Sequence, residues 1–382
     1  MRTRGFYMVC CCLLLVGCVE PYAPDAIKNP NRYLVVDGFL NGNGVTTVKL
    51  SRTQNIAEDT LATDETGATI FIEDEQGAQE ALAEVETGIY KTSVQLDPAR
   101  RYRLAIRTAE GKVYASEYVE VKQTPPIDEV PWNIAGREVI ISVDTHDPQN
   151  STRYYRWECE STWEYTSAYN AFLKYDTALD SIVGMGKDEF SLYHCWQTEP
   201  STDIRIATSV LLSQDVVSRY VLQTVPAESE RLRIRYSLLV KQYALTKEAY
   251  QYWEALKKNT ESIGTLFDPL PTQLTGNVHC LSVPDEPVMG YVGASTVQEK
   301  RIFIDRDELP EAWVIEYPTC PVDSILLADV PLYFEQSDQY LPYTQLYTTT
   351  SPFALLGYTI ARRHCLDCTE LGGTNVEPDF WK

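Results

Sequence analysis

A series of short alternating segments constrains the fold of this chain more than any other feature. Between Arg32 and Val121, runs of seven to ten residues alternate apolar with polar side chains, and turn signals such as "NGNG" and "AEGK" lie between or beside them. A period of two places one set of side chains on the core face of a strand. Six or seven strands in about ninety residues is the spacing of an immunoglobulin-like sandwich. We therefore predict a mainly β fold that begins with such a sandwich over residues 32–123.

A proline-rich link ends this first domain. "QTPPIDEV" (Gln123–Val130) contains two adjacent prolines, which remove strand hydrogen-bond donors and stiffen the chain. Residues 127–382 are predicted to form a larger β-rich domain with one helical insertion near residues 246–263. Thr246 is a suitable N-cap for that helix and Gly264 a suitable stop. The C-terminal segment is rich in loops.

Aromatic side chains alternate with charged ones in "YYRWECESTWEY", residues 154–165. Such a ladder forms either one face of a core or an exposed platform for carbohydrate or peptide. We favour core packing, because large aromatic side chains dominate the interiors of β-sandwiches.

The N-terminus has the pattern of an export signal. Arg2 and Arg4 precede an apolar run that ends at Leu15-Val16-Gly17-Cys18. This run is too short to span a bilayer as a helix, so residues 1–17 are predicted to be a cleaved signal peptide. Cys18 then becomes the first residue of a lipidated N-terminus, with residues 18–31 as a tether. The alternative is an ordinary signal peptide with an incidental cysteine.

The charge balance limits the partners that the mature chain can bind. Without Arg2 and Arg4, 31 basic residues face 54 acidic ones, which gives a formal charge of −23. This charge repels nucleic acid and anionic lipid. We expect no nucleic-acid binding, and membrane contact through the lipid anchor only.

Six cysteines remain after the signal cysteines and Cys18 are set aside. An even number in an exported chain favours disulfides, and full pairing allows 15 connectivities. Cys159–Cys195 is our first choice, since both lie in strand-like segments. Zinc is the less favoured alternative, with His364 and three of the six cysteines as ligands. The six are Cys159, Cys195, Cys280, Cys320, Cys365 and Cys368.

No sequence pattern supports catalysis. The chain lacks a Gly-x-Ser-x-Gly elbow, a His-Glu-x-x-His motif, a phosphate-binding loop and a dinucleotide fingerprint. The close carboxylates of Asp305–Glu311 lack the glycine and spacing of a calcium loop and are interpreted as a solvated turn. We expect no catalytic residue, no metal and no cofactor.

Several stretches together resemble one known family. They are "CVEPY", "LVVDGFL", "TVKLSRT", "VKQYALTKEAYQYWEALKKNTESIGTLFDPLPTQLTGNV", "GYVGASTVQEKRIFI" and "CLDCTELGGTNVEPDFW". The chain resembles the Bacteroidota lipoprotein family catalogued as domain of unknown function number 4249. The resemblance implies an outer-membrane lipoprotein encoded beside a TonB-dependent receptor, and it supplies no catalytic residues. Positions characteristic of the family include Tyr250, Trp253, Phe267, Asp268, Pro269, Gly276, Asn277, Gly290, Tyr291, Cys368, Gly373, Asn375, Pro378 and Trp381.

From these features we predict a lipid-anchored outer-membrane accessory subunit of a TonB-dependent receptor in nutrient uptake. The cargo and the face of the membrane stay open. The C-terminal pair Phe380 and Trp381 is a candidate partner-binding element, because it must either pack into the body or dock on another molecule. A free-standing ligand-binding or adhesive surface lipoprotein is the alternative, and a secreted hydrolase is the third possibility.

Overall fold

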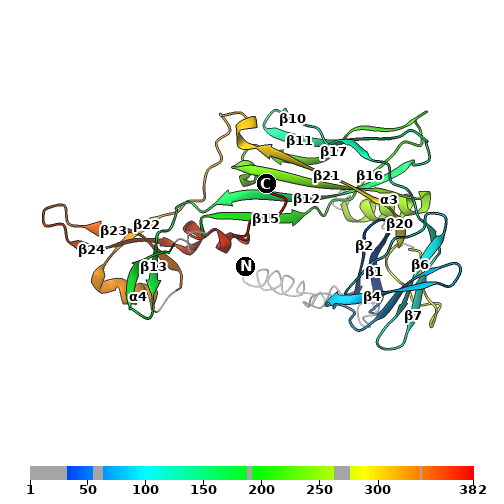
Figure 1. Ribbon diagram of the computed structural model, residues 1–382, viewed down its shortest axis with the longest axis horizontal. Helices are drawn as coiled ribbons and strands as arrows, with labels where there is room; N and C mark the ends of the chain where they lie inside the picture. The colour runs from blue at the N-terminus through cyan, green and yellow to red at the C-terminus, as the bar shows by residue number, and fades with distance from the viewer. Residues whose placement is uncertain (1–31, 55–62, 187–191, 262–275, 336–337) are drawn as a thin grey trace, which may run out of the picture.

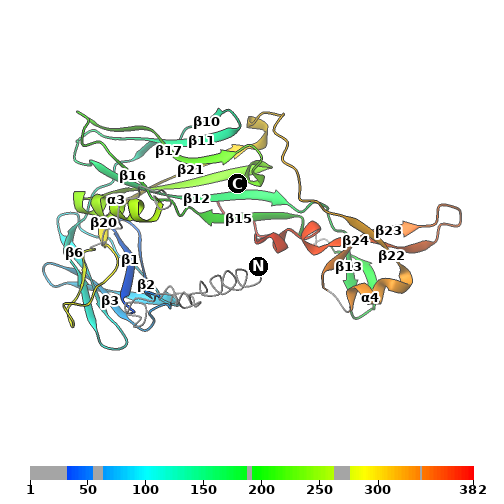
Figure 2. The ribbon, with the colours of Figure 1, turned by 180° about the vertical axis from the view of Figure 1, so that it is seen from behind.

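The computed structural model describes residues 32–54, 63–186, 192–261, 276–335 and 338–382 (Figure 1). Strands dominate it, which confirms the predicted mainly β fold. Three parts follow one another along the longest axis: an N-terminal body, a central sandwich, and a smaller module at the far end (Figures 1 and 2). Within the described residues, no helix is both long and apolar enough to cross a bilayer.

The N-terminal body is a sheet of ten strands wrapped around one core. β4 pairs with both β3 and β5, so the two layers of the predicted sandwich are one continuous sheet. Its order is β19-β7-β6-β3-β4-β5-β2-β1-β20, with β8 paired to β6. The strands are β1 (Leu34–Asn41), β2 (Val45–Arg52), β3 (Thr69–Asp74), β4 (Gln79–Glu86), β5 (Ile89–Ser93), β6 (Arg101–Arg107), β7 (Val113–Ser116), β8 (Val119–Glu120), β19 (Val278–Cys280) and β20 (Gly293–Ser295).

Alternation along β1 shows how this sequence forms its core. Leu34, Val36 and Leu40 are almost fully buried, whereas Asp37 and Phe39 face outward. A shift of pairing by one residue would exchange the two sets, so burial of the apolar face fixes the register.

The segment 276–295 returns to the N-terminal body. The domain boundary predicted from the sequence, at residues 123–127, would place this segment in the second domain. β19 pairs antiparallel with β7, and β20 pairs parallel with β1. Glycine permits the close approach: a Cβ added at Gly290 would lie 2.0 Å from Val36 O, and one at Gly276 would lie 1.7 Å from Gly290 O. Sequence periodicity could not reveal this return, because three-residue strands carry too little pattern.

The central sandwich consists of two packed sheets. One has the order β10-β11-β17, with β9 paired to β11; the other has the order β15-β12-β18-β21, with β16 paired to β12. Tyr155, Trp157, Trp163 and Tyr165 lie in the core between them, which confirms core packing for the aromatic ladder. The strands are β9 (Ile127–Glu129), β10 (Trp132–Ala135), β11 (Glu138–Asp147), β12 (Tyr154–Thr166), β15 (His194–Pro200), β16 (Arg205–Thr208), β17 (Asp215–Pro226), β18 (Arg235–Ala244) and β21 (Val297–Asp305), with 3-10 helices η2 (Glu230–Leu232) and η3 (Arg306–Glu308).

Helix α3 (Lys247–Glu261) is the predicted helical insertion, and the residues that follow it, up to 275, lie outside the described part. Thr246 caps it as predicted, since its Oγ1 accepts a hydrogen bond from Ala249 N at 3.1 Å. The helix packs where the N-terminal body meets the central sandwich, in a cluster that includes Phe39, Trp253 and Tyr291.

The module at the far end, residues 167–186 and 318–371, is called here the projecting module. The sequence predicts a C-terminal segment rich in loops, but the described residues of this module contain two small sheets with apolar clusters of their own. Its elements are β13 (Leu173–Asp176), β14 (Ser181–Gly184), β22 (Val322–Leu326), η4 (Leu327–Asp329), α4 (Val330–Phe334), β23 (Tyr340–Tyr347), β24 (Leu355–Arg362), η5 (Arg363–Cys365) and η6 (Cys368–Leu371).

Candidate functional site

The predicted lipidation residue, Cys18, lies outside the described residues, as do the signal peptide and the tether at residues 18–31.

Two disulfides join four of the six predicted cysteines. Cys195 bonds to Cys368, and Cys320 bonds to Cys365. Cys159 and Cys280 are free and buried. The preferred pair Cys159–Cys195 is therefore wrong.

Strand register explains the error. β12 and β15 are antiparallel neighbours, and Cys195 lies opposite Tyr165 rather than opposite Cys159. Six residues of β12 separate those two positions, which is about 20 Å along a strand. A disulfide allows only about 4.4–6.8 Å between Cα atoms. Cys368 approaches from the C-terminal segment instead, with a Cα–Cα distance of 5.8 Å to Cys195.

The two disulfides fasten the base of the projecting module. Cys195–Cys368 ties η6 to β15 of the central sandwich, and Cys320–Cys365 closes the module on itself. Hydrogen bonds reinforce the same place: Tyr165 OH donates to Cys368 O at 2.8 Å, and Tyr169 OH donates to Cys320 O at 2.8 Å. The module is therefore held to the body covalently as well as by packing.

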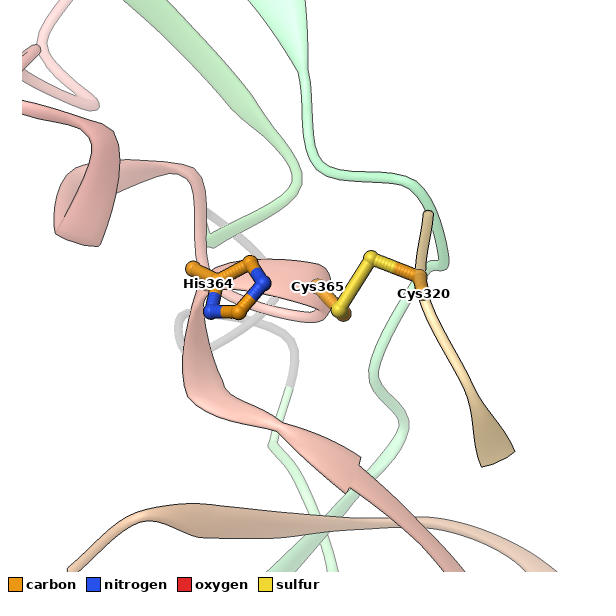
Figure 3. Close-up of side chains that lie close together, drawn as sticks. All are labelled: Cys320, His364 and Cys365. Atoms are coloured by element: carbon orange, nitrogen blue, oxygen red, sulfur yellow. A yellow bond between two sulfur atoms is a disulfide. The ribbon is translucent and has the colours of Figure 1, made fainter. Parts of the chain in front are cut away.

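Cys320, His364 and Cys365 are the one group of possible metal ligands found within the described residues. Figure 3 shows the His364 ring beside the disulfide that joins the two cysteines. A metal-binding thiolate must be free and deprotonated, so a disulfide sulfur does not take that role. With Cys368 bonded to Cys195, the four-ligand zinc arrangement considered from the sequence is not assembled.

The C-terminal pair packs onto the central sandwich instead of extending from it. Trp381 is 4% exposed, its indole lies edge-on to Phe303 with ring centroids 5.6 Å apart, and its Nε1 donates to Glu164 Oε2 at 3.3 Å. Phe380 remains 37% exposed beneath the Arg301 guanidinium, 3.5 Å from its ring centroid. This burial removes Trp381 from the surface that a partner could touch.

Exposed apolar side chains gather instead on the projecting module. Of the 25 large hydrophobic residues exposed in the described part, ten lie on it, counting Leu371 at the end of η6, and a gathering of this kind is typical of an interaction surface. They are Phe172, Leu179, Val322, Leu326, Leu327, Leu332, Tyr347, Phe353, Leu356 and Leu371.

The β23–β24 hairpin is the most distinctive part of this module. Residues 339–361 contain no Asp, Glu, Lys, Arg or His, although the chain is strongly acidic overall. Phe353 is 72% exposed, and the hairpin extends to the end of the molecule opposite the N-terminal body (Figure 1). An uncharged surface with exposed aromatic and aliphatic groups has little desolvation cost on binding and fits a protein interface. The long run without charged residues is the sequence signal that could have identified this surface.

Fold and surface together define a mainly β protein with a covalently fastened projecting module that exposes apolar side chains. The chain belongs to the family described as "Domain of unknown function (DUF4249)", whose model matches residues 19–301. The match includes the N-terminal body and most of the central sandwich, and it ends before β22.

Other comparisons add little. No curated protein matches the chain. Among solved structures, one described as a membrane anchored protein from Corynebacterium diphtheriae is 13% identical, with a TM-score of 0.17. That comparison covers 70% of this chain and 62% of the other, so this chain spans less than two thirds of that structure's length. Similarity this low carries no argument about fold or function.

Proposed function

We propose that this chain is a Bacteroidota outer-membrane lipoprotein, anchored by acyl chains on Cys18, that serves as a non-catalytic accessory subunit of a TonB-dependent receptor. The concentration of exposed apolar residues on the projecting module is the observation that carries the docking role. The lipobox and the family resemblance support the location and the kind of partner.

The lipid anchor favours a partner in the same membrane. The tether at residues 18–31 is 14 residues long and can reach at most about 50 Å when fully extended. A lipid-held protein meets integral proteins of its own bilayer at high effective concentration, so a modest docking surface is sufficient. The remainder of this chain is strongly acidic and would repel an acidic partner surface. The uncharged hairpin avoids that electrostatic repulsion.

Co-purification with matched variants tests the docking role. The wild-type lipoprotein, tagged and extracted from outer membranes in mild detergent, is expected to recover a TonB-dependent receptor. Phe353→Ser combined with Leu356→Ser is expected to reduce recovery at least about tenfold, because each buried apolar side chain contributes about 1.5–3 kcal/mol. The control is Val210→Ser combined with Leu211→Ser, which removes two exposed apolar groups from the central sandwich.

The proposal fails if the wild type recovers no receptor, or if both double variants recover it equally well. Mass spectrometry of the N-terminal peptide tests the anchor separately, since an unmodified Cys18 would contradict lipidation.

A further inference from the structure

A groove of about 950 Å³ lies between the N-terminal body and the central sandwich, beside α3. The docking role proposed above does not use it. One wall is the outer face of β1, β2 and β5, where Asp37, Phe39, Thr47, Lys49 and Lys91 line the groove. Strand pairing sets Phe39, Thr47 and Lys91 in one row across these three strands.

The opposite wall is the outer face of β12, β18 and β21, together with α3. The Arg156 guanidinium stacks 3.8 Å from the centroid of the Trp253 ring. Tyr243 OH donates to Glu158 Oε2 at 2.6 Å, and the Tyr243 ring meets Phe39 of the other wall with centroids 4.9 Å apart. These contacts hold Arg156, Trp253 and Tyr243 in fixed positions, so this wall is ordered before any ligand arrives.

The groove has a fixed width, because the two bodies are joined where it ends. Asn43 accepts a hydrogen bond from Val297 N at 2.8 Å and donates one to Val297 O at 3.1 Å. Nearby, Thr296 N, between β20 and β21, donates to Lys122 O at 2.9 Å, just before the proline-rich link begins. A preformed cavity at a domain junction, of a size within the usual range, is the ordinary setting of a small-molecule site.

We infer that this groove binds a neutral oligosaccharide of a few sugar units. This choice of ligand class follows from the charges that line the groove. Four cationic side chains, Lys49, Lys91, Arg156 and Lys241, stand among three carboxylates, Asp37, Glu158 and Glu299. An apolar ligand would desolvate these charges without replacing their hydrogen bonds. Arg156 already pairs with Glu158, and Lys241 Nζ lies 3.8 Å from Glu299 Oε1, so the lining offers little unpaired positive charge to a polyanion.

An extended peptide finds few free backbone groups along most of this groove. The main-chain groups of β1, β2, β12 and β18 are already paired on both sides, so these strands offer side chains to a ligand. β21 ends its sheet and lines the groove through Val297 and Glu299. Addition of a peptide strand needs unpaired backbone donors and acceptors.

Sugar hydroxyls match the mixed lining. Each hydroxyl both donates and accepts, so it can donate to a carboxylate and accept from an ammonium group in the same groove. Phe39, Trp253 and Tyr291 are partly exposed at the groove and add apolar surface that the C–H groups of a pyranose ring can contact.

The test uses the whole mature lipoprotein, purified in mild detergent without any receptor, so its outcome is independent of the docking role. Isothermal titration calorimetry is performed with maltohexaose, cellohexaose, laminarihexaose, xylohexaose and mannohexaose as probes. At least one of them is expected to bind. Thr47→Trp, at an exposed position of β2, is expected to fill the groove and weaken that binding more than tenfold. Lys91→Ala is expected to weaken it about 2- to 10-fold, the effect of one hydrogen bond.

The matched control is Ala81→Trp, which places the same bulk on an exposed position of β4 outside the groove lining and is expected to bind like the wild type. Thermal melting of each variant shows that it is folded. The inference is overturned if none of the five probes binds, if Thr47→Trp binds as well as the wild type, or if oligogalacturonate, which is anionic, binds as tightly as the best neutral probe.

Discussion

Asp147 shows how a single buried carboxylate stabilises the central sandwich. Its oxygens accept hydrogen bonds from Gln149 N, from Ser151 N and Oγ, and from Thr152 N, at 2.8–2.9 Å. Burial alone would raise the pKa of Asp147, but these hydrogen bonds outweigh it and lower the pKa to about 2. The charged form is therefore favoured in the folded protein, where it organises the turn after β11.

Asp147→Asn is expected to destabilise the protein in a pH-dependent way. The folded pKa lies below the unfolded value of about 3.9, so the carboxylate contributes about 2–3 kcal/mol above that value, and this contribution is lost as the pH falls toward 2. Urea unfolding of wild type and variant at several pH values from 7 down to 3 measures the difference. A difference that stays constant over that range would contradict the assignment.

Sequence reasoning missed two residues that line the groove, Arg156 and Lys91. In the sequence, Arg156 is one of the charged positions opposite the aromatic ladder. In the structure it is 16% exposed on its side chain and stacked on Trp253 of α3. Nothing in the local sequence indicates that a helix ninety or so residues further along covers it.

At the scale of elements, the disulfides connect segments that are distant in sequence. Cys195 and Cys368 are 173 residues apart, so their bond closes a long loop in the unfolded chain. Long loops give the larger stabilisation in the chain-entropy account, about 2–5 kcal/mol. This bond also fixes the projecting module to β15, so its loss affects the attachment of a whole element.

Cys195→Ala combined with Cys368→Ala is therefore expected to lower the free energy of unfolding by about 2–5 kcal/mol. It should also increase hydrogen exchange around η6. Cys280→Ala, at a free buried cysteine, is the control and is expected to leave exchange at η6 unchanged. Peptide mapping without reduction checks the bonds directly: recovery of a Cys159–Cys195 peptide would contradict the connectivity described here.

At the scale of the whole molecule, the N-terminal body and the central sandwich share a short junction. β20 pairs with β1 of the first, and the chain continues directly into β21 of the second. Asn43, on the turn between β1 and β2, bonds to Val297 at the start of β21. The junction therefore determines the spacing of the groove walls and the position of the N-terminal body relative to the central sandwich.

Asn43→Ala is expected to loosen this junction, because two hydrogen bonds of about 0.5–1.5 kcal/mol each are lost. Hydrogen exchange at residues 293–299 should rise while exchange in the β3–β6 region stays unchanged. Asn133→Ala, at an exposed position of β10, is the control. Equal exchange in the two variants would show that the junction does not depend on Asn43.

The sequence by itself determined the strands between Arg32 and Val121, the capped helix α3 and the burial of the aromatic ladder, because each depends on a local period or cap that neighbouring residues encode. It also indicated the family. Only the tertiary structure decided which cysteines pair, that residues 276–295 rejoin the first sheet, that Trp381 is buried, and that a projecting module and a charged aromatic groove exist. These features depend on contacts between distant segments, and their register follows from packing over the whole chain rather than from any short stretch of it.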